Sequence, residues 1–234
     1  MAAISTLNAI GGLTAASFRP KCHRMVTSLA KRSPARNSDA MRARILAAVA
    51  KMIVRDGLSA IGVNALAREA GCDKVLIYRY FGDLEGVWAA YAAQSDFWWS
   101  VEELTRGIDP SRLTLAGAMK TILRRHAHAL RARPVTLAVL AAELTNRTRL
   151  VVALEAVRER RALELSAWIA ERFPLPPAAD LEAVGMLVGV AINYLAVRAR
   201  AIRVMGGVKI RSEADWERIL AAVDALIDGV LRAD

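Results

Sequence analysis

The sequence predicts an all-α protein. Hydrophobic residues make up 55% of its 234 residues, which is enough to bury a substantial core in one large or two modest domains. Ala, Leu, Val, Arg and Glu dominate the composition, and this mixture favours helices. No sustained alternation of apolar and polar residues is present, so the pattern gives no indication of amphipathic strands.

The formal net charge of +10 is compatible with a nucleic-acid partner, with an anionic membrane surface, or simply with solubility. Charge alone does not choose among these partners. The two cysteines, Cys22 and Cys72, lie in different contexts and suggest no disulfide framework. This usage predicts a reducing, cytoplasmic compartment.

Residues 1–36 differ in composition from the rest of the chain because they contain no acidic residue. Ser, Thr, Pro and Gly are scattered among six basic residues without a helical period: Arg19, Lys21, Arg24, Lys31, Arg32 and Arg36. We expect a disordered basic arm. An organellar transit peptide has a similar composition, and a basic arm next to a DNA-binding unit can also reach phosphates or a minor groove.

A first helix is predicted from about Ser38, a plausible N-cap, to Asp56. A second is predicted after Gly62, because Val63, Leu66, Ala67 and Ala70 recur at helical spacing and form one apolar face. Gly71 follows at once, where the end of a helix needs a residue that tolerates positive φ. The chain therefore turns sharply at this point.

A third helix is predicted after Asp73, whose side chain can cap it. Ile77 and Phe81 are four residues apart and can anchor this helix inward. The other side of the helix then presents cationic, hydroxyl and small apolar groups: Lys74, Val75, Tyr78 and Arg79. A short helix with this outer surface suits the major groove of DNA, so residues 37–82 are predicted to be a helix-turn-helix DNA-binding domain.

Residues 83–234 are predicted to be a second helical domain. A long connecting helix starts near Asp83 and continues through Val101. Further amphipathic helices are predicted at about Ser111–Arg131, Pro134–Thr145, Thr148–Phe173, Ala179–Ile202 and Ser212–Leu231. The last one opens with Ser212 and Asp215, a spacing close to that of a capping box.

The N-terminal motifs resemble those of the TetR family of bacterial transcriptional regulators. The likeness covers residues 38–90 and is carried by four segments, at Ile45–Ala50, Asp56–Ala60, Leu66–Gly71 and Asp73–Asp83, the last reading D-K-V-L-I-Y-R-Y-F-G-D. Beyond residue 90 the resemblance is architectural. It implies an effector-binding and dimerisation domain, a homodimer on a double-stranded, roughly palindromic DNA operator, and release of DNA by a small molecule.

The same resemblance implies roles for individual residues of the reading head. Asn64, Lys74, Val75 and Leu76 would face bases, while Tyr78 and Tyr80 would contact phosphates or base edges. From the residues themselves, Tyr78 is open to another interpretation, as a packing aromatic with an exposed hydroxyl. For Leu76, packing between helices is an equal alternative, and Arg79 either contacts phosphate or lies on a solvated face.

Two positions depart from the family pattern. Leu84 stands where many members have a lysine that contacts phosphate, and Gly62 replaces a common Thr cap. Affinity for the DNA backbone must then come from elsewhere, and the candidates are Arg42, Arg44 and the basic N-terminal arm. These departures keep a rival hypothesis open, in which the protein has the TetR fold and binds a partner but no specific DNA.

The last two helices are predicted to form the dimer interface. Each carries an apolar stripe, and the second stripe is too wide for one neighbouring helix. The candidate interface residues are Val188, Ile192, Leu195, Trp216, Leu220, Val223 and Ile227. An intrachain core would produce the same stripes, so that alternative stays open.

A pocket for an apolar effector is predicted among the middle helices. Its candidate lining residues are Trp98, His126, Asn146, Trp168 and Asn193. His126 and His128 are two residues apart and do not share a helix face, and no cluster has the spacing of metal ligands. No metal site, cofactor or enzymatic activity is therefore expected.

No membrane partner is expected either. The longest apolar stretch, around Val184–Val197, contains Asn193 and Tyr194, and Arg198 and Arg200 follow it. It falls short of the roughly 20 residues that span a bilayer. This stretch is predicted to be a buried helix.

Overall fold

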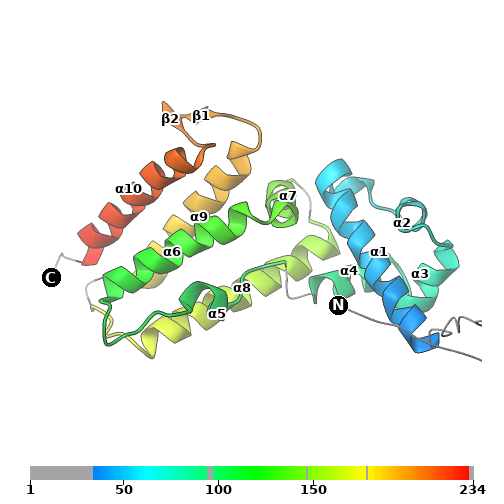
Figure 1. Cartoon of the computed structure of the whole chain (residues 1–234), viewed down its shortest axis with the longest axis horizontal. Helices are drawn as coiled ribbons and strands as arrows, with labels where there is room; N and C mark the ends of the chain where they lie inside the picture. The colour runs from blue at the N-terminus through cyan, green and yellow to red at the C-terminus, as the bar shows by residue number, and fades with distance from the viewer. Residues whose placement is uncertain (1–33, 94–96, 146, 178, 232–234) are drawn as a thin grey trace, which may run out of the picture.

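The computed structural model of the chain describes residues 34–93, 97–145, 147–177 and 179–231. A head of three helices lies at one end of an elongated molecule (Figure 1). It consists of α1 (Pro34–Asp56), α2 (Val63–Ala70) and α3 (Lys74–Phe81), with a short 3-10 turn at Leu58–Ala60. The predicted basic arm falls on residues 1–33, outside the described residues, but Pro34–Arg36 already belong to α1.

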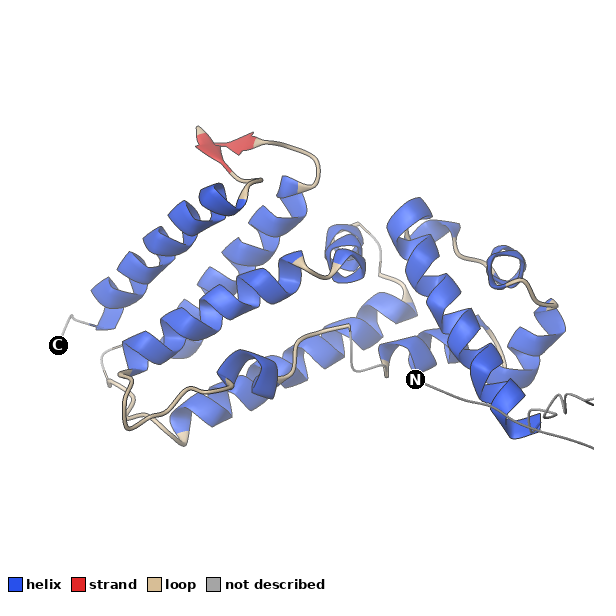
Figure 2. Ribbon diagram, in the orientation of Figure 1, coloured by secondary structure: helices blue, strands red, loops and turns tan. Residues whose placement is uncertain are grey.

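The body of the molecule is built from seven more helices of the described chain. They are α4 (Leu84–Ala92), α5 (Val101–Thr105), α6 (Leu115–Arg131), α7 (Pro134–Glu143), α8 (Arg149–Ala170), α9 (Leu181–Ala199) and α10 (Glu213–Leu231). A small antiparallel hairpin, β1 (Val204–Met205) and β2 (Val208–Lys209), joins α9 to α10. Figure 2 shows that helices dominate everywhere else, so the predicted all-α class is confirmed.

The turn between α2 and α3 follows the predicted chemistry. Gly71 ends α2 with φ of 61°, in the left-handed region that glycine adopts without a steric penalty. Asp73 caps α3 by accepting a hydrogen bond from the backbone N–H of Val75 at 2.8 Å. Ile77 is fully buried and anchors α3 in the core that it shares with α1 and α2. α1 starts at Pro34, four residues earlier than predicted, so Ser38 lies within the helix and is not its N-cap.

The junction between α3 and α4 is unusually tight. Asp83 caps α4 by accepting from the backbone N–H of Gly86 at 2.7 Å. A Cβ atom placed on Gly86 would overlap the carbonyl oxygen of Phe81 in the last turn of α3. Only a residue without a side chain lets the two helices approach so closely, so Gly86 fixes how the reading helix meets the connector.

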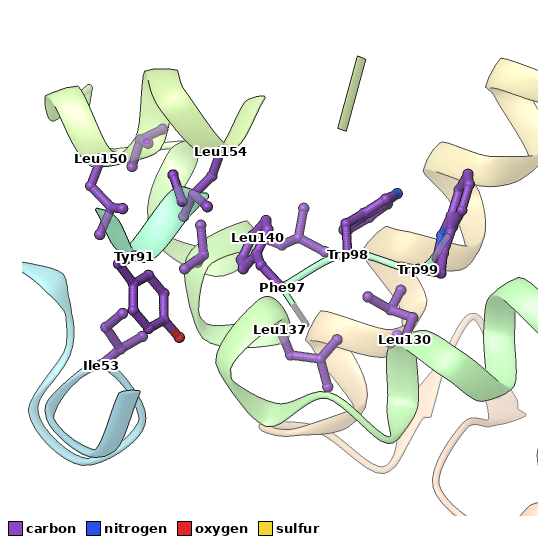
Figure 3. Close-up of a cluster of buried hydrophobic side chains, with 14 of the residues drawn as sticks. Ile53, Tyr91, Phe97, Trp98, Trp99, Leu130, Leu137, Leu140, Leu150 and Leu154 are labelled. Atoms are coloured by element: carbon purple, nitrogen blue, oxygen red, sulfur yellow. The ribbon is translucent and has the colours of Figure 1, made fainter. Parts of the chain in front are cut away.

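One continuous core joins the head to the body. Ile53 of α1, Tyr91 of α4 and Leu150 and Leu154 of α8 are all buried in the same hydrophobic cluster. In Figure 3 the Tyr91 ring lies between Ile53 on one side and the two leucines on the other. The head is therefore packed directly on the body, through α4 and through the contact of α1 with α7.

The prediction of a long connecting helix is wrong, because the helix is shorter than expected. The helix that starts after Asp83 ends at Ala92, and Phe97–Ser100 are not helical. Ser100 caps a new helix, α5, by accepting from the N–H of Glu103 at 3.1 Å. Phe97, Trp98 and Trp99 are all buried. Three successive residues would point in three directions on a helix with one apolar stripe, so irregular backbone suits them better.

The predicted dimer face of α10 is wrong, because that face is the chain's own core. Trp216, Leu220, Val223 and Ile227 are buried in the single chain. Ion pairs hold α10 against α6 beside them: Lys120–Asp228, Arg124–Asp224, Arg124–Glu217 and Arg131–Glu213. The intrachain core that the stripe also allowed is what forms.

The prediction of a buried helix around Val184–Val197 is wrong for the single chain. Ile192 and Ala196 are the residues of α9 that are buried, so Ile192 too belongs to the chain's own core, while Val188 and Leu195 are half-buried. A second stripe, Met186, Leu187, Val190 and Tyr194, is exposed. With 19 residues, α9 is also long and apolar enough to cross a membrane by length and composition, contrary to the predicted shortfall.

Gly86 and Gly117 offer a matched test of the α3–α4 junction. Each is the third residue after an N-cap, and each donates its N–H to the capping side chain. We expect Gly86→Ala to lower the free energy of unfolding by about 1–3 kcal/mol, because backbone must shift. Gly117→Ala meets ordinary contacts and should be neutral or stabilising by up to about 1 kcal/mol. Equal effects in urea titrations would contradict the close approach.

Candidate functional site

The outer surface of α3 is the first candidate site. Val75 and Tyr78 are 61% and 50% exposed, although both are large and largely apolar. Lys74 and Arg79 are exposed beside them. This surface combines a cation at the helix N-terminus, a second cation, a hydroxyl and an aliphatic group. Those groups can donate to bases and phosphates and contact a thymine methyl.

The other predicted DNA-facing residues are less uniformly placed. Asn64 at the start of α2 is exposed, whereas Leu76 and Tyr80 are half-buried. Tyr80 packs against the core. Leu84 is also half-buried and packs on the core, which gives it a role in the α3–α4 junction.

Arg42 and Arg44 brace the head from α1. The Arg42 guanidinium donates to the carbonyl oxygen of Tyr80 at 2.8 Å and lies 5.1 Å from the centroid of the Phe81 ring. Arg44 donates to the carbonyl oxygen of Gly71 at 2.9 Å. Both side chains stay exposed. A guanidinium has five N–H donors, so each retains donors for a phosphate while held in place.

The second candidate site is a cavity of about 1080 Å³ in the body. It is lined by the segment before α5 and by α6, α7, α8 and α9, and most of its wall is apolar. Representative apolar residues are Leu104, Met119, Ile122, Leu140, Leu165 and Val190. A concave, mostly apolar space with a few placed polar groups is typical of a small-molecule site.

A hydrogen-bonded relay crosses the wall of this cavity. The indole N–H of Trp99 donates to Nδ1 of His126 at 2.7 Å, so that nitrogen is unprotonated. Nε2 of His126 therefore carries the proton and lies 2.9 Å from Oδ1 of Asn193 on α9, which accepts it. The relay connects the segment before α5, α6 and α9 with every member satisfied.

Burial keeps His126 neutral. Its pKa is lowered from the usual 6.5 to about 4, mainly because burial penalises the charged imidazolium, although the bond to Asn193 opposes the shift. Protonation of Nδ1 would also break the bond from Trp99. The neutral ring is thus part of the structure.

Two other donors in the wall have no acceptor among the described residues. They are Nε1 of Trp98 and Nε of Arg198, both fully buried atoms. A buried donor left unpaired costs roughly 1–3 kcal/mol. Arg158 in the same wall, by contrast, is paired with Glu143 at 2.8 Å. The described residues contain no cluster of three His, Cys, Asp or Glu side chains suited to a metal ion.

Comparison with known proteins identifies the head. Residues 45–91 match the model of the bacterial regulatory proteins of the tetR family. The head belongs to the TetR family. The protein is a DNA-binding regulator of transcription. No curated protein sequence matches it.

Solved structures extend the likeness of this TetR-family protein to the whole fold. A fatty acid degradation regulator, FadR, from Bacillus halodurans has 19% identity and a TM-score of 0.59, covering 86% of this chain and 98% of its own. A TetR-family regulator from Haemophilus influenzae has 15% identity and a TM-score of 0.56, covering 81% and 97%. NalD of Pseudomonas aeruginosa, a repressor of a multidrug efflux pump, has 15% identity and a TM-score of 0.53, covering 82% and 95%.

Some of the residues predicted to line the effector pocket of this TetR-family protein do line the cavity. Trp98, His126 and Asn193 lie in its wall. Trp168 does not, because its ring packs against Phe173 and the Arg172 guanidinium instead. Asn146 lies outside the described residues. Sequence reasoning missed Trp99, which pairs with His126, and Arg198. Trp99 directly follows the candidate Trp98 in the sequence, and this adjacency could have drawn attention to it.

His126 should make the stability of this TetR-family protein depend on pH. The unfolded chain protonates the ring below about 6.5, whereas the folded chain does so only below about 4. Stability from the neutral ring is therefore complete above pH 6.5 and is lost as the pH falls from 6.5 to 4. At 1.36 kcal/mol per pKa unit this amounts to about 3 kcal/mol per chain.

Urea denaturation at several pH values checks this, with His128→Asn as the control because His128 is exposed on the same helix. His126→Asn should flatten the profile between pH 4 and 6.5, and His128→Asn should leave it steep. The same slope in both variants would rule out the assignment.

Proposed function

We propose that the protein is a homodimeric repressor that binds a roughly palindromic DNA operator through α3 and releases it when a small, largely apolar molecule occupies the cavity. The observation that carries this proposal is the outward side of α3. It exposes Lys74, Val75, Tyr78 and Arg79 together on a helix that is anchored by a fully buried Ile77.

Phosphate affinity in this proposal comes from Tyr78, Arg42 and Arg44. The hydroxyl of Tyr78 extends from a half-exposed ring, and the two arginines are held at the turn and at the end of α3. Their tethering supports the proposal because pre-positioned side chains lose less conformational entropy on binding. Lys74 and Val75 read base edges, and Asn64 reaches them from α2.

Dimerisation in this proposal uses the exposed side of α9. Leu187 of α9 is 63% exposed and lies outside the cavity wall, whereas Val190 and Tyr194, which are 56% and 48% exposed, border both this face and the cavity. Leu226 of α10 is 61% exposed. An exposed apolar stripe of this size on a soluble regulator is typical of a protein–protein interface. Half-buried Val188 and Leu195 flank the stripe and remain candidates for its margin.

In this proposal, α8 and α4 transmit the effect of ligand binding from the cavity to the reading helix. The middle of α8 lines the cavity with Arg158 and Ala162, and its N-terminal part packs Leu150 and Leu154 against α4. Arg149 of α8 also forms an ion pair with Glu85 of α4. A ligand that displaces α8 therefore displaces the connector to the reading helix.

DNA selection from random duplexes, followed by fluorescence anisotropy on the best operator, tests the DNA-binding proposal. Tyr78→Phe removes a phosphate hydrogen bond and should weaken binding about three- to tenfold. Lys74→Ala should either reduce the dependence of affinity on salt, by about one released counterion per chain, or relax the preference at one base pair.

Arg160→Ala is the charge-matched control, since Arg160 is exposed on α8 in the body. It should leave operator affinity unchanged. Wild-type affinity in both head variants would remove the proposed role of α3. Binding that shows no preference for sequence would favour the rival hypothesis of a TetR-fold interaction protein.

Leu187→Glu should convert the dimer into a monomer at micromolar concentration, because it buries a charge at the proposed interface. Leu226→Glu should weaken the dimer in the same way. Val152→Glu serves as the control, since Val152 is 43% exposed on α8, away from this stripe. Analytical ultracentrifugation measures the mass. A wild-type monomer, or a Leu187→Glu dimer as tight as the control, would overturn this interface.

A further inference from the structure

The cavity wall contains two indoles that are neighbours in sequence but differ in hydrogen bonding. Trp99 donates its N–H to His126, whereas the N–H of Trp98 has no acceptor among the described residues. Trp98 is only 4% exposed, and a buried N–H without an acceptor is unfavourable. Figure 3 shows its indole nitrogen at the end of the ring that is turned away from Leu140.

A second donor in the same wall carries a permanent charge. Nε of Arg198 on α9 is buried without an acceptor, and Arg198 forms no ion pair within the described part of the chain. The charged residues Glu159, Glu182 and Arg200 also border the cavity, but they are exposed and solvated. The two buried atoms of the wall that lack a partner are thus both donors, and one of them belongs to a cation.

The hydroxyls of Ser166 and Tyr194, on a half-buried and an exposed residue, also line the wall. The histidine and one arginine of the wall already have partners. His126 is held between Trp99 and Asn193, and Arg158 is paired with Glu143. A ligand that required donors and acceptors of both kinds would have to break these bonds. A ligand that offers acceptor oxygens and is otherwise apolar would complete the wall without breaking any of them.

We propose that the effector is an apolar carboxylate, with a hydrocarbon body in the cavity and carboxylate oxygens that accept hydrogen bonds from Trp98 Nε1 and the Arg198 guanidinium. A guanidinium remains protonated at any physiological pH and matches a carboxylate in geometry, which favours an anionic head over a neutral one. This inference rests on the proposal that the cavity is the effector site.

Isothermal titration calorimetry of the DNA-free protein tests the ligand class with three probes of equal chain length. They are decanoate, decan-1-ol and decylammonium, each kept below the concentration at which it aggregates. We expect decanoate to bind at least tenfold more tightly than decan-1-ol and decylammonium to bind more weakly still. Equal affinities, or no binding of decanoate, would overturn the inference.

Two substitutions locate the head group. Trp98→Phe keeps an aromatic ring but removes the N–H, and it should weaken decanoate about tenfold. Arg198→Met should remove most of the preference for decanoate over decan-1-ol. Trp168→Phe is the matched control, because Trp168 packs on Phe173 outside the cavity. Equal losses in Trp98→Phe and Trp168→Phe would contradict the assignment, and thermal melts show whether each variant is folded.

Operator release is measured separately on the protein–DNA complex. If decanoate binds selectively to the free protein without releasing DNA, the ligand class stands and the proposed release fails. If decanoate does not bind while operator binding is normal, the ligand class fails and the DNA-binding proposal stands.

Discussion

The packing of α4 against both halves of the molecule is the constraint on which the rest of the structure depends. Tyr91 is 6% exposed and lies between Ile53 of the head and Leu150 and Leu154 of α8. At the other end of α4, Gly86 brings the helix against the last turn of α3. Close-packed interiors transmit displacement because they compress little. The head also contacts α7 through α1, so the orientation of the reading helix depends on both α7 and α8, and both helices line the cavity.

The head could be predicted from the sequence almost residue by residue because its signals are local. The end of α2 at Gly71 and the cap at Asp73 follow from backbone chemistry that involves only neighbouring residues. The reciprocal bonds between Ser212 and Asp215 at the start of α10 are of the same kind. Such signals survive any tertiary arrangement. The burial of Ile77 and the exposure of Val75 also follow, since a short helix that packs on one side has only one anchoring face.

The body could be predicted only as a set of helices, because an apolar stripe does not say which neighbour covers it. The stripe that contains Trp216 and Leu220 could have met a second chain or α6, and the charges that decide the choice are distant in sequence. Lys120, Arg124 and Arg131 on α6 face acidic residues of α10. The break after Ala92 is equally non-local: three consecutive buried aromatics need walls on several sides. Those walls come from helices that the local pattern cannot place.

The hydrogen bonding of the polar groups in the cavity wall also depends on residues that are distant in sequence. Trp98 and Trp99 are identical residues in adjacent positions, and nothing in the local sequence distinguishes them. What distinguishes them is the position of His126, held by Asn193 on a third segment. In a wall where His126 and Arg158 are paired, an unpaired indole N–H and an unpaired guanidinium nitrogen are departures from the rule that buried donors find acceptors. Departures of this kind concentrate where a protein meets another molecule. The two donors that folding alone leaves unsatisfied therefore predict that the ligand carries hydrogen-bond acceptors.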